Sequence, residues 1–466
     1  MVFSSLIFLF LFLPITLFVY FISPNVIKNS ILLIVSFIFY AWGEPQYILL
    51  MILSVSVNYF FGLGIYYFKS VKTLQKSTLA LAIVFNLAIL SYYKYSGFFL
   101  ENINNLFGTT FEGTNLALPI GISFYTFQAL SYLIDVYRKS SLIQRNPFNL
   151  ALYIALFPQL VAGPIVRYDE IEDQLKNRVH SIDKFYEGLG IFTIGLAKKL
   201  VIANQMAVIA DDIFSQDPSE LSLFLAWIGI IAYAMQIYFD FCGYSEMAIG
   251  LGKMFGFDFP RNFNYPYISK SISEFWRRWH ITLGSWFRDY LYIPLGGNRV
   301  SKWKGIRNLF IVWFLTGLWH GASWNFIVWG LFYGVIIALE KTSFGKKIQK
   351  LPAALQHSYV IILFLIGWVI FRSPDLPFAI DYLAAMAQLP NSFTTIDPNI
   401  MYYLKQYGIE FAVGLIATTP LLKNLMNKEI FSFKQYVLPF VYLLLLAYCS
   451  MVLMTSSYNP FIYFRF

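Results

Sequence analysis

The chain is poor in the residues on which soluble enzymes and disulfide-rich scaffolds depend. Only 13% of its 466 residues are charged, against about 25% in soluble domains. Its two cysteines, Cys242 and Cys449, both lie in apolar stretches, so they provide neither a disulfide framework nor a cysteine metal site. The first apolar stretch, 1–22, lacks a basic start and a small-residue cleavage site, and we expect a membrane span there instead of a signal peptide.

Apolar sequence dominates what is present. Hydrophobic residues make up 58% of the chain, and many segments reach the roughly 18–20 apolar residues that cross a bilayer. The alternating ten-residue strands of a membrane barrel are absent from the sequence. We therefore predict an all-α polytopic membrane protein that forms one membrane-embedded domain over 1–466. Ten stretches are predicted to cross completely: 1–22, 30–44, 46–68, 79–99, 116–134, 188–210, 221–251, 355–371, 407–423 and 436–457.

The distribution of charge predicts the topology. The net charge of +9 is explained by basic cytoplasmic loops, so we expect membrane lipid and no nucleic acid as a partner. The loops 69–78 and 135–147 are basic and are placed inside, whereas 211–220 is acidic and is placed outside. The long segment 253–305 is rich in lysine and arginine and is predicted to be cytoplasmic. Ten crossings then leave both termini outside.

Two further segments are predicted to enter and leave the membrane on the cytoplasmic face. The segment 148–166 lies between two cytoplasmic ends and is broken by Pro158 and Gly163-Pro164. The segment 306–339 has basic flanks and small residues near its middle, which favours a helical hairpin over the alternative of one long tilted helix. Broken backbone at that depth requires cover by protein or a water-filled cavity.

Ionisable side chains inside these apolar stretches are the candidates for function. His320 lies in the uncharged run from Asn308 to Leu339, at the predicted turn of the hairpin. A charged group at membrane depth is costly, and a neutral imidazole can take a proton from a hydroxyl. Asp240 lies mid-span and either lines a tunnel or locks a helix, while Lys198-Lys199 either snorkel to an interface or face the site.

The cytoplasmic segment from Ser271 to Pro294 is predicted to form one amphipathic helix. Ser271 and Glu274 have capping-box spacing. His280 falls in the middle of the apolar face, where it is either a structural histidine or part of the site. Arg277 and Arg278 on the polar face bind either lipid headgroups or the phosphates of a cytoplasmic acyl donor.

Several strings in this order resemble the membrane-bound O-acyltransferase (MBOAT) family. The resemblance is strongest to its bacterial alginate O-acetyltransferase branch, with the teichoic-acid D-alanyl transferase as a cousin, and it extends over nearly the whole chain. The strings are F-P-Q-L-V-A-G-P-I at 157–165, Y-F-D-F-C-G-Y-S at 238–245, S-E-F-W-R-R-W-H-I-T-L at 273–283, F-R-D-Y-L-Y-I-P-L-G-G-N-R at 287–299, G-L-W-H-G-A-S-W-N-F at 317–326 and Y-N-P-F-I-Y-F-R-F at 458–466.

The resemblance implies transfer of an acyl group, generally acetyl, through a ring of helices around a central tunnel to a hydroxyl of an extracytoplasmic polysaccharide. It places the chain in the bacterial inner membrane, makes His320 the catalytic residue and His280 the second polar residue of the site. Acetyl-CoA or another acyl thioester is the implied co-substrate, with no bound cofactor and no metal. Alginate, peptidoglycan and other envelope glycans stay open as acceptors, as does a partner protein that receives the acyl group.

Two details of the mechanism stay open in the sequence. Asn325, Ser323 and Trp319 are candidates for oxyanion donors or tunnel lining. The C-terminal tail, 458–466, resembles the C-terminal aromatic motif of the helper protein in the D-alanylation system, so Tyr463 either carries the acyl group or belongs to an aromatic belt. The alternative function is a polysaccharide or proton-coupled transporter or flippase with His320 and Asp240 as a proton relay.

Overall fold

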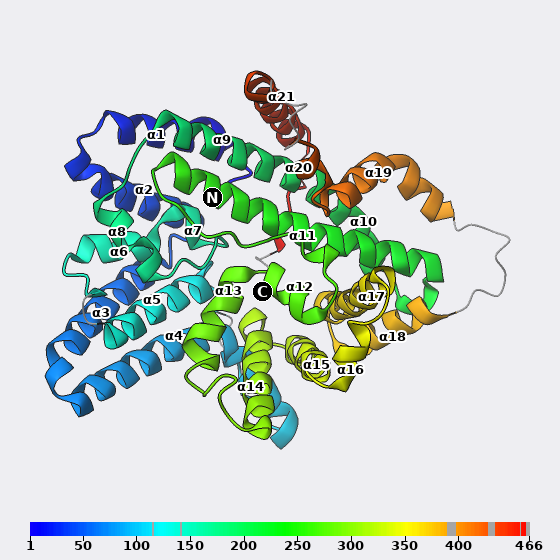
Figure 1. The fold of residues 1–466 in the computed structure, drawn as a ribbon, viewed down its shortest axis with the longest axis horizontal. Helices are drawn as coiled ribbons and strands as arrows, with labels where there is room; N and C mark the ends of the chain where they lie inside the picture. Colours follow the sequence, from blue (N-terminus) through cyan, green and yellow to red (C-terminus); the bar gives the residue numbers. More distant parts are fainter. Residues whose placement is uncertain (114–115, 140–141, 389–397, 427–433, 457, 463–466) are drawn as a thin grey trace. The chain divides into compact units, whose positions relative to one another are not determined.

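The computed structural model describes residues 1–113, 116–139, 142–388, 398–426, 434–456 and 458–462. Every regular element in these ranges is a helix (Figure 1), which confirms the predicted all-α class. Within the same ranges, 7 helices are long and apolar enough to cross a membrane, as expected for a polytopic protein. They are Asn25–Gly43, Ile48–Ser70, Lys72–Phe107, Ile182–Phe214, Leu223–Met254, Ala353–Arg372 and Tyr436–Thr455.

The other three predicted spans are shorter or shifted. The stretch 1–22 holds a short apolar helix over Phe8–Ile22. Helix α5, Ile122–Arg138, begins only after Gly121, which has a φ of 76° and whose missing Cβ leaves room for the carbonyl of Leu160. Helix α19, Pro398–Ala417, begins earlier than the predicted span 407–423 and ends before Pro420, because proline cannot continue a helix.

The chain folds into two compact units. The first comprises Met1–Phe192 and Ser245–Pro260, and the second comprises Thr193–Tyr244 and Arg261–Phe466. The chain therefore passes from one unit to the other within helix α9, Ile182–Ala197, and within helix α11, Leu223–Met254. The prediction of a single domain stays a prediction.

The first unit contains the N-terminal helices and the broken segment 148–166. Two short helices, with a break at Leu156, occupy that segment. Polar side chains bind the irregular backbone: Ser36 Oγ accepts from Phe157 N at 3.1 Å, and Gln159 Nε2 donates to Tyr153 O at 2.5 Å. The helices of this unit are α1 Leu13–Ile22, α2 Lys28–Gly43, α3 Ile48–Tyr67, α4 Lys72–Phe107, α5, α6 Pro147–Ala155, α7 Phe157–Leu160, α8 Tyr168–Lys176 and most of α9.

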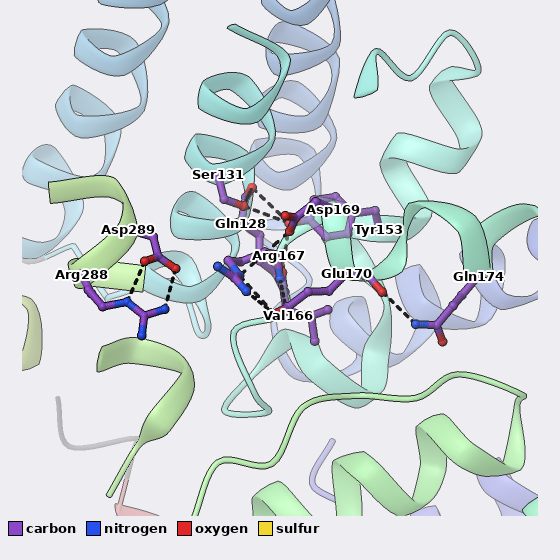
Figure 2. Close-up of polar contacts among 10 residues, drawn as sticks. All are labelled: Gln128, Ser131, Tyr153, Val166, Arg167, Asp169, Glu170, Gln174, Arg288 and Asp289. Atoms are coloured by element: carbon purple, nitrogen blue, oxygen red, sulfur yellow. Dashed lines mark hydrogen bonds and ion pairs between the residues drawn. The ribbon is translucent and has the colours of Figure 1, made fainter. Parts of the chain in front are cut away.

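A polar cluster fixes the chain where it leaves this broken segment (Figure 2). Arg167 donates from Nη2 to Glu170 Oε1 at 2.5 Å, and its backbone N–H donates to Glu170 Oε2 at 3.1 Å. Tyr153 OH donates to Val166 O at 3.0 Å. The start of α8 is thus held by its own first-turn glutamate and by a tyrosine of α6, which satisfies backbone groups that would otherwise be orphaned.

The second unit contains both candidate histidines. A π-helix, Lys198–Ala203, connects α9 to α10, and another, Arg288–Tyr292, follows α13; in the latter, Arg288 pairs with Asp289 at 2.7 Å (Figure 2). The helices of this unit are the end of α9, α10 Asn204–Phe214, most of α11, α12 Ile272–Arg278, α13 Ile281–Phe287, α14 Lys302–His320, α15 Trp324–Glu340, α16 Ser343–Ile348, α17 Ala353–Arg372, α18 Leu376–Ala387, α19, α20 Leu421–Met426 and α21 Lys434–Thr455.

Helices α14 and α15 pack against each other along their lengths (Figure 1). The chain turns between them at residues 321–323, so the predicted hairpin stretch consists of two helices. Gly317 lies against the carbonyl of Phe326, and Gly330 against the carbonyl of Trp313, at distances that leave no room for a Cβ. Small residues at helix crossings let two backbones approach in this way.

The prediction of one amphipathic helix from Ser271 to Pro294 is wrong. Helix α12 ends at Arg278, Trp279 is extended, and α13 begins at Ile281. The predicted cap is present, since Ser271 Oγ accepts from Glu274 N at 3.0 Å. The break lies at His280, which has a φ of 44°, and its cause is a distant asparagine described below.

Candidate active site

His320 is the last residue of α14, at the turn of the hairpin. Its side chain is buried and is surrounded by aromatic rings. The imidazole meets the ring of Trp329 edge to face at a centroid distance of 4.9 Å and that of Phe371 at 5.3 Å. The turn follows because Gly321 is fully extended and Ser323 is the N-cap residue of α15, so the imidazole is presented at a helix end.

His280 owes its position to Asn262. Asn262 Oδ1 lies 3.1 Å from His280 Nδ1 and accepts from Thr282 Oγ1 at 2.9 Å, while Asn262 O accepts from Ile281 N at 2.9 Å. These bonds cap α13 from outside and hold His280 in the left-handed region, which only a few per cent of non-glycine residues adopt.

The protonation state of His280 follows from the same contacts. Burial lowers the pKa of its imidazole to about 3, so the ring is neutral at pH 7. Because Asn262 Oδ1 can only accept, Nδ1 carries the proton and Nε2 presents a lone pair. Within the described residues, Nε2 is buried and has no hydrogen-bond partner.

Trp319 lies next to both histidines. Its ring centroid is 5.0 Å from that of His320 and 5.9 Å from that of His280. The structure therefore brings together the two histidines predicted to be catalytic, from α14 and from the break between α12 and α13, around one indole.

A small cavity adjoins His320. Its volume is about 10 Å³, which is near the minimum that holds one water molecule. The indole N–H of Trp329 is buried and has no hydrogen-bond partner within the described residues, and Trp329 is one wall of this cavity. The lining residues are Ile237, Phe241, Trp279, His320, Trp329, Trp368, Phe371 and Ile462.

The C-terminal segment, residues 458–462, reaches this cavity through Ile462. Ile462 N donates to Asp240 Oδ2 at 2.7 Å. The other carboxylate oxygen of Asp240 pairs with Lys199 Nζ at 2.8 Å. Asp240 thus binds both Lys199 and the C-terminal segment, and the alternatives of tunnel lining and helix locking stay predictions.

The remaining predicted site residues are distributed around this region or lie beyond it. Asn325 Nδ2 donates to Ser373 O at 2.7 Å and so ties the start of α15 to the end of α17. Ser323 is half-buried at the hairpin turn. Arg278 pairs with Glu274 at 2.9 Å, whereas Arg277 is exposed. Tyr463 lies outside the described residues.

Sequence reasoning missed Asn262 and underrated Lys199. An asparagine between Arg261 and Phe263 is a weak signal, and its partners lie about twenty positions later in the chain. The pairing of Lys199 with Asp240 had a usable signal, because two opposite charges inside predicted spans are expected to pair with each other.

Comparisons with known proteins agree with the resemblance drawn from the motifs. The model of the MBOAT, membrane-bound O-acyltransferase family matches residues 36–371, a range that includes both histidines. A probable alginate O-acetylase AlgI of Pseudomonas putida is 40% identical over 492 residues, covering 100% of both chains. A peptidoglycan O-acetyltransferase of Helicobacter pylori is 34% identical over 517 residues, covering 100% of this chain and 98% of its own. A teichoic acid D-alanyltransferase of Bacillus subtilis is more distant, 30% identical over 280 residues, 55% of this chain and 68% of its own.

Proposed function

Because the chain belongs to the membrane-bound O-acyltransferase family, it is a membrane O-acyltransferase, and we propose that it moves an acetyl group from a cytoplasmic thioester to an extracytoplasmic hydroxyl. The acceptor in this proposal is a cell-envelope polysaccharide, reached directly or through a partner protein. The names of the alginate and peptidoglycan O-acetyltransferases support the acetyl group and the polysaccharide. The observation that carries the proposal is His320, buried beside a cavity at the turn of two apolar helices.

In the proposed reaction, His320 takes the proton from the acceptor hydroxyl as its oxygen attacks the thioester carbonyl. The carbon–sulfur bond of the resulting tetrahedral intermediate breaks, and the leaving thiolate receives the proton from His320. Such a base contributes roughly 10²–10⁴-fold to the rate. The indole N–H of Trp329 is the proposed donor to the oxyanion, since it is buried, unpaired within the described residues and next to His320.

The walls of the cavity support a short acyl group. Trp279, Trp329 and Trp368 are almost fully buried, and the space that they leave is about 10 Å³. A space of that size holds about one water molecule, so even an acetyl group has to displace part of this wall, and each additional methylene of a longer chain displaces more of the close-packed rings. Acetyl is therefore favoured over longer acyl chains.

The test compares wild type with His320→Ala in acetyl transfer from acetyl-CoA by purified protein. We expect loss of both thiol release and ester formation, with an unchanged unfolding temperature. The matched control is His357→Gln, a half-buried histidine whose Nδ1 lies 3.1 Å from Ser269 O, and it should keep its activity. Near-normal transfer by His320→Ala would refute the role of His320, and transport of substrate without thioester consumption would favour the transporter alternative.

Tyr463 as a transient acyl carrier is a further part of this proposal. Its support is the position of Ile462, the preceding residue, which lines the cavity beside His320. The phenol oxygen would attack the thioester carbonyl and lose its proton to His320, the carbon–sulfur bond would break, and the leaving thiolate would take that proton. The acceptor hydroxyl would later attack the phenyl ester, and its proton would pass to the released phenolate. Mass spectrometry of the C-terminal peptide should detect acetyl-tyrosine after incubation with acetyl-CoA, and full activity of Tyr463→Phe would contradict the carrier role.

A further inference from the structure

A buried ion pair joins the π-helix Lys198–Ala203 to α11 near the site. Lys199 Nζ lies 2.8 Å from Asp240 Oδ1, and the two side chains are 3% and 2% exposed. A buried pair is tolerated only where further hydrogen bonds satisfy both groups. The partners that satisfy this pair therefore indicate its purpose.

Those partners are main-chain atoms of the C-terminal segment. Asp240 Oδ2 accepts from the N–H of Ile462 at 2.7 Å, and Lys199 Nζ donates to the carbonyl oxygen of Pro460. The carboxylate and the ammonium thus bind one donor and one acceptor that are two residues apart. Since both contacts are to backbone, they fix the register of the segment independently of its side chains.

Local helix geometry presents Lys199 for this contact. Lys199 lies in the π-helix Lys198–Ala203, inserted between α9 and α10. The wider turn of a π-helix changes the direction of the side chains it carries, and such insertions are frequent at functional sites. Lys198, the neighbouring lysine, is directed instead to Cys242 Sγ, at 3.8 Å.

Additional contacts hold the segment on both sides of the pair. Tyr458 OH donates to Asp211 Oδ2 at 2.5 Å, and Asn204 Nδ2 donates to Asn459 Oδ1 at 3.2 Å. The ring of Phe461 lies 4.7 Å from that of Tyr244. Every residue from 458 to 462 therefore makes a specific contact with α10, α11 or the π-helix between α9 and α10, and the segment lies beside α11 (Figure 1).

We propose that Lys199 and Asp240 are positioning residues that dock the C-terminal segment, residues 458–462, against the wall of the His320 cavity. The segment contributes Ile462 to that wall, so its docking completes the surroundings of the catalytic histidine. This inference rests on the proposed function only for its consequence in acyl transfer. The docking itself is a property of the structure that is measured without any reaction.

The test uses two double variants that both remove the buried charges. Lys199→Met/Asp240→Asn keeps an oxygen that can accept from Ile462 N–H, whereas Lys199→Met/Asp240→Leu does not. Neither leaves an unpaired buried charge, so both are expected to fold. Lys198→Met is the matched control, since it removes the adjacent lysine of the same π-helix.

Docking is measured on the full-length protein by carboxypeptidase digestion followed by intact mass. We expect wild type and the control to retain Ile462, the Leu double variant to lose it, and the Asn double variant, which keeps one of the two contacts, to be trimmed more slowly than the Leu double variant. A pair that serves only helix packing would give equal trimming in both double variants, and that result would overturn the proposal. Loss of Ile462 from wild type at the same rate would overturn it as well.

The consequence for transfer is measured as separate kcat and KM values for acetyl-CoA. The Leu double variant loses the hydrogen bond that Ile462 N–H makes to residue 240. Because such a bond contributes about 1–3 kcal/mol, we expect kcat of this variant to fall roughly tenfold or more. The KM for acetyl-CoA should change by less than about threefold, because donor binding is left intact. If the Leu double variant is trimmed but fully active, docking has no role in transfer and the positioning role is refuted, whatever the result for His320→Ala.

Discussion

At the scale of single residues, Trp329 illustrates how burial turns an ordinary side chain into a candidate for catalysis. It is fully buried, its ring packs against His320, and its indole N–H has no partner within the described residues. An unsatisfied buried donor costs about 1–3 kcal/mol. That cost is understandable if the donor is kept for an oxyanion that exists only during the reaction.

Replacing Trp329 with Phe should therefore lower kcat strongly while changing the free energy of unfolding only slightly. The ring and most of its packing remain, while the N–H is lost. Removal of one oxyanion donor typically costs about 10²–10³ in kcat, and we expect a loss of that order in steady-state transfer from acetyl-CoA. Trp303→Phe is the control, because Trp303 is 82% exposed. Equal kcat values for the two variants would exclude Trp329 as the donor.

His280 predicts a dependence of stability on pH. In the folded protein, burial lowers the pKa of the His280 imidazole to about 3. In the unfolded chain the pKa of a histidine is about 6.5. Between pH 3 and pH 6.5 the unfolded chain therefore binds more protons at this residue than the folded protein does. The contribution of His280 to the free energy of unfolding is complete above pH 6.5 and is lost as the pH falls toward 3, by about 1.4 kcal/mol per pH unit.

The variant His280→Asn should remove this dependence. Asparagine tolerates the left-handed backbone and can still donate to Asn262 Oδ1 from the position of Nδ1, but it does not titrate. Thermal unfolding of wild type and variant between pH 7 and pH 5 should show a steeper loss for wild type. Parallel curves would mean that His280 is not buried as a neutral imidazole.

At the scale of elements, the hairpin of α14 and α15 depends on two glycines at its crossing. A methyl group at Gly330 would collide with the carbonyl oxygen of Trp313. We expect Gly330→Ala to destabilise the protein by about 1–3 kcal/mol and to reduce transfer, because the hairpin carries His320. Thermal unfolding and the acetyl-CoA assay measure the two effects.

Gly305 provides the matched control for this substitution. It lies in the first turns of α14, and a Cβ there would meet nothing within 4 Å. Gly305→Ala should therefore stabilise the helix by up to about 1 kcal/mol through helix propensity. A destabilisation equal to that of Gly330→Ala would show that close approach of the two backbones is not the cause.

The difference between α14–α15 and α12–α13 explains what the sequence could predict. The hairpin break has local signals, since Gly317, Gly321 and Ser323 are close to the turn that they permit. The break at His280 has none, because the apolar period continues through it and the interrupting bonds come from Asn262. Local patterns predicted the helices and singled out His320, and the family resemblance added His280. The left-handed backbone at His280, which Asn262 stabilises, could be found only in the folded structure.

At the scale of the whole molecule, the distribution of charge carries information that no single contact does. The basic loop 69–78 and the acidic loop 211–220 are predicted to lie on opposite faces of the membrane. The proposed function needs this arrangement, since it takes the thioester from the cytoplasm and delivers the acetyl group to a glycan outside. An orientation with both loops on one face would separate His320 from one of its substrates.

Cysteine labelling in intact cells tests the orientation directly. Ser70 and Ser219 are exposed, one in each of these loops, and the native Cys242 and Cys449 are buried. A maleimide that cannot cross the membrane should label Ser219→Cys in intact cells and Ser70→Cys only after permeabilisation, with wild type giving the background. Labelling of Ser70→Cys in intact cells would place the basic loop outside. The cytoplasmic thioester would then meet the face of the protein that the proposal assigns to the glycan, and the proposed direction of acetyl transfer would be wrong.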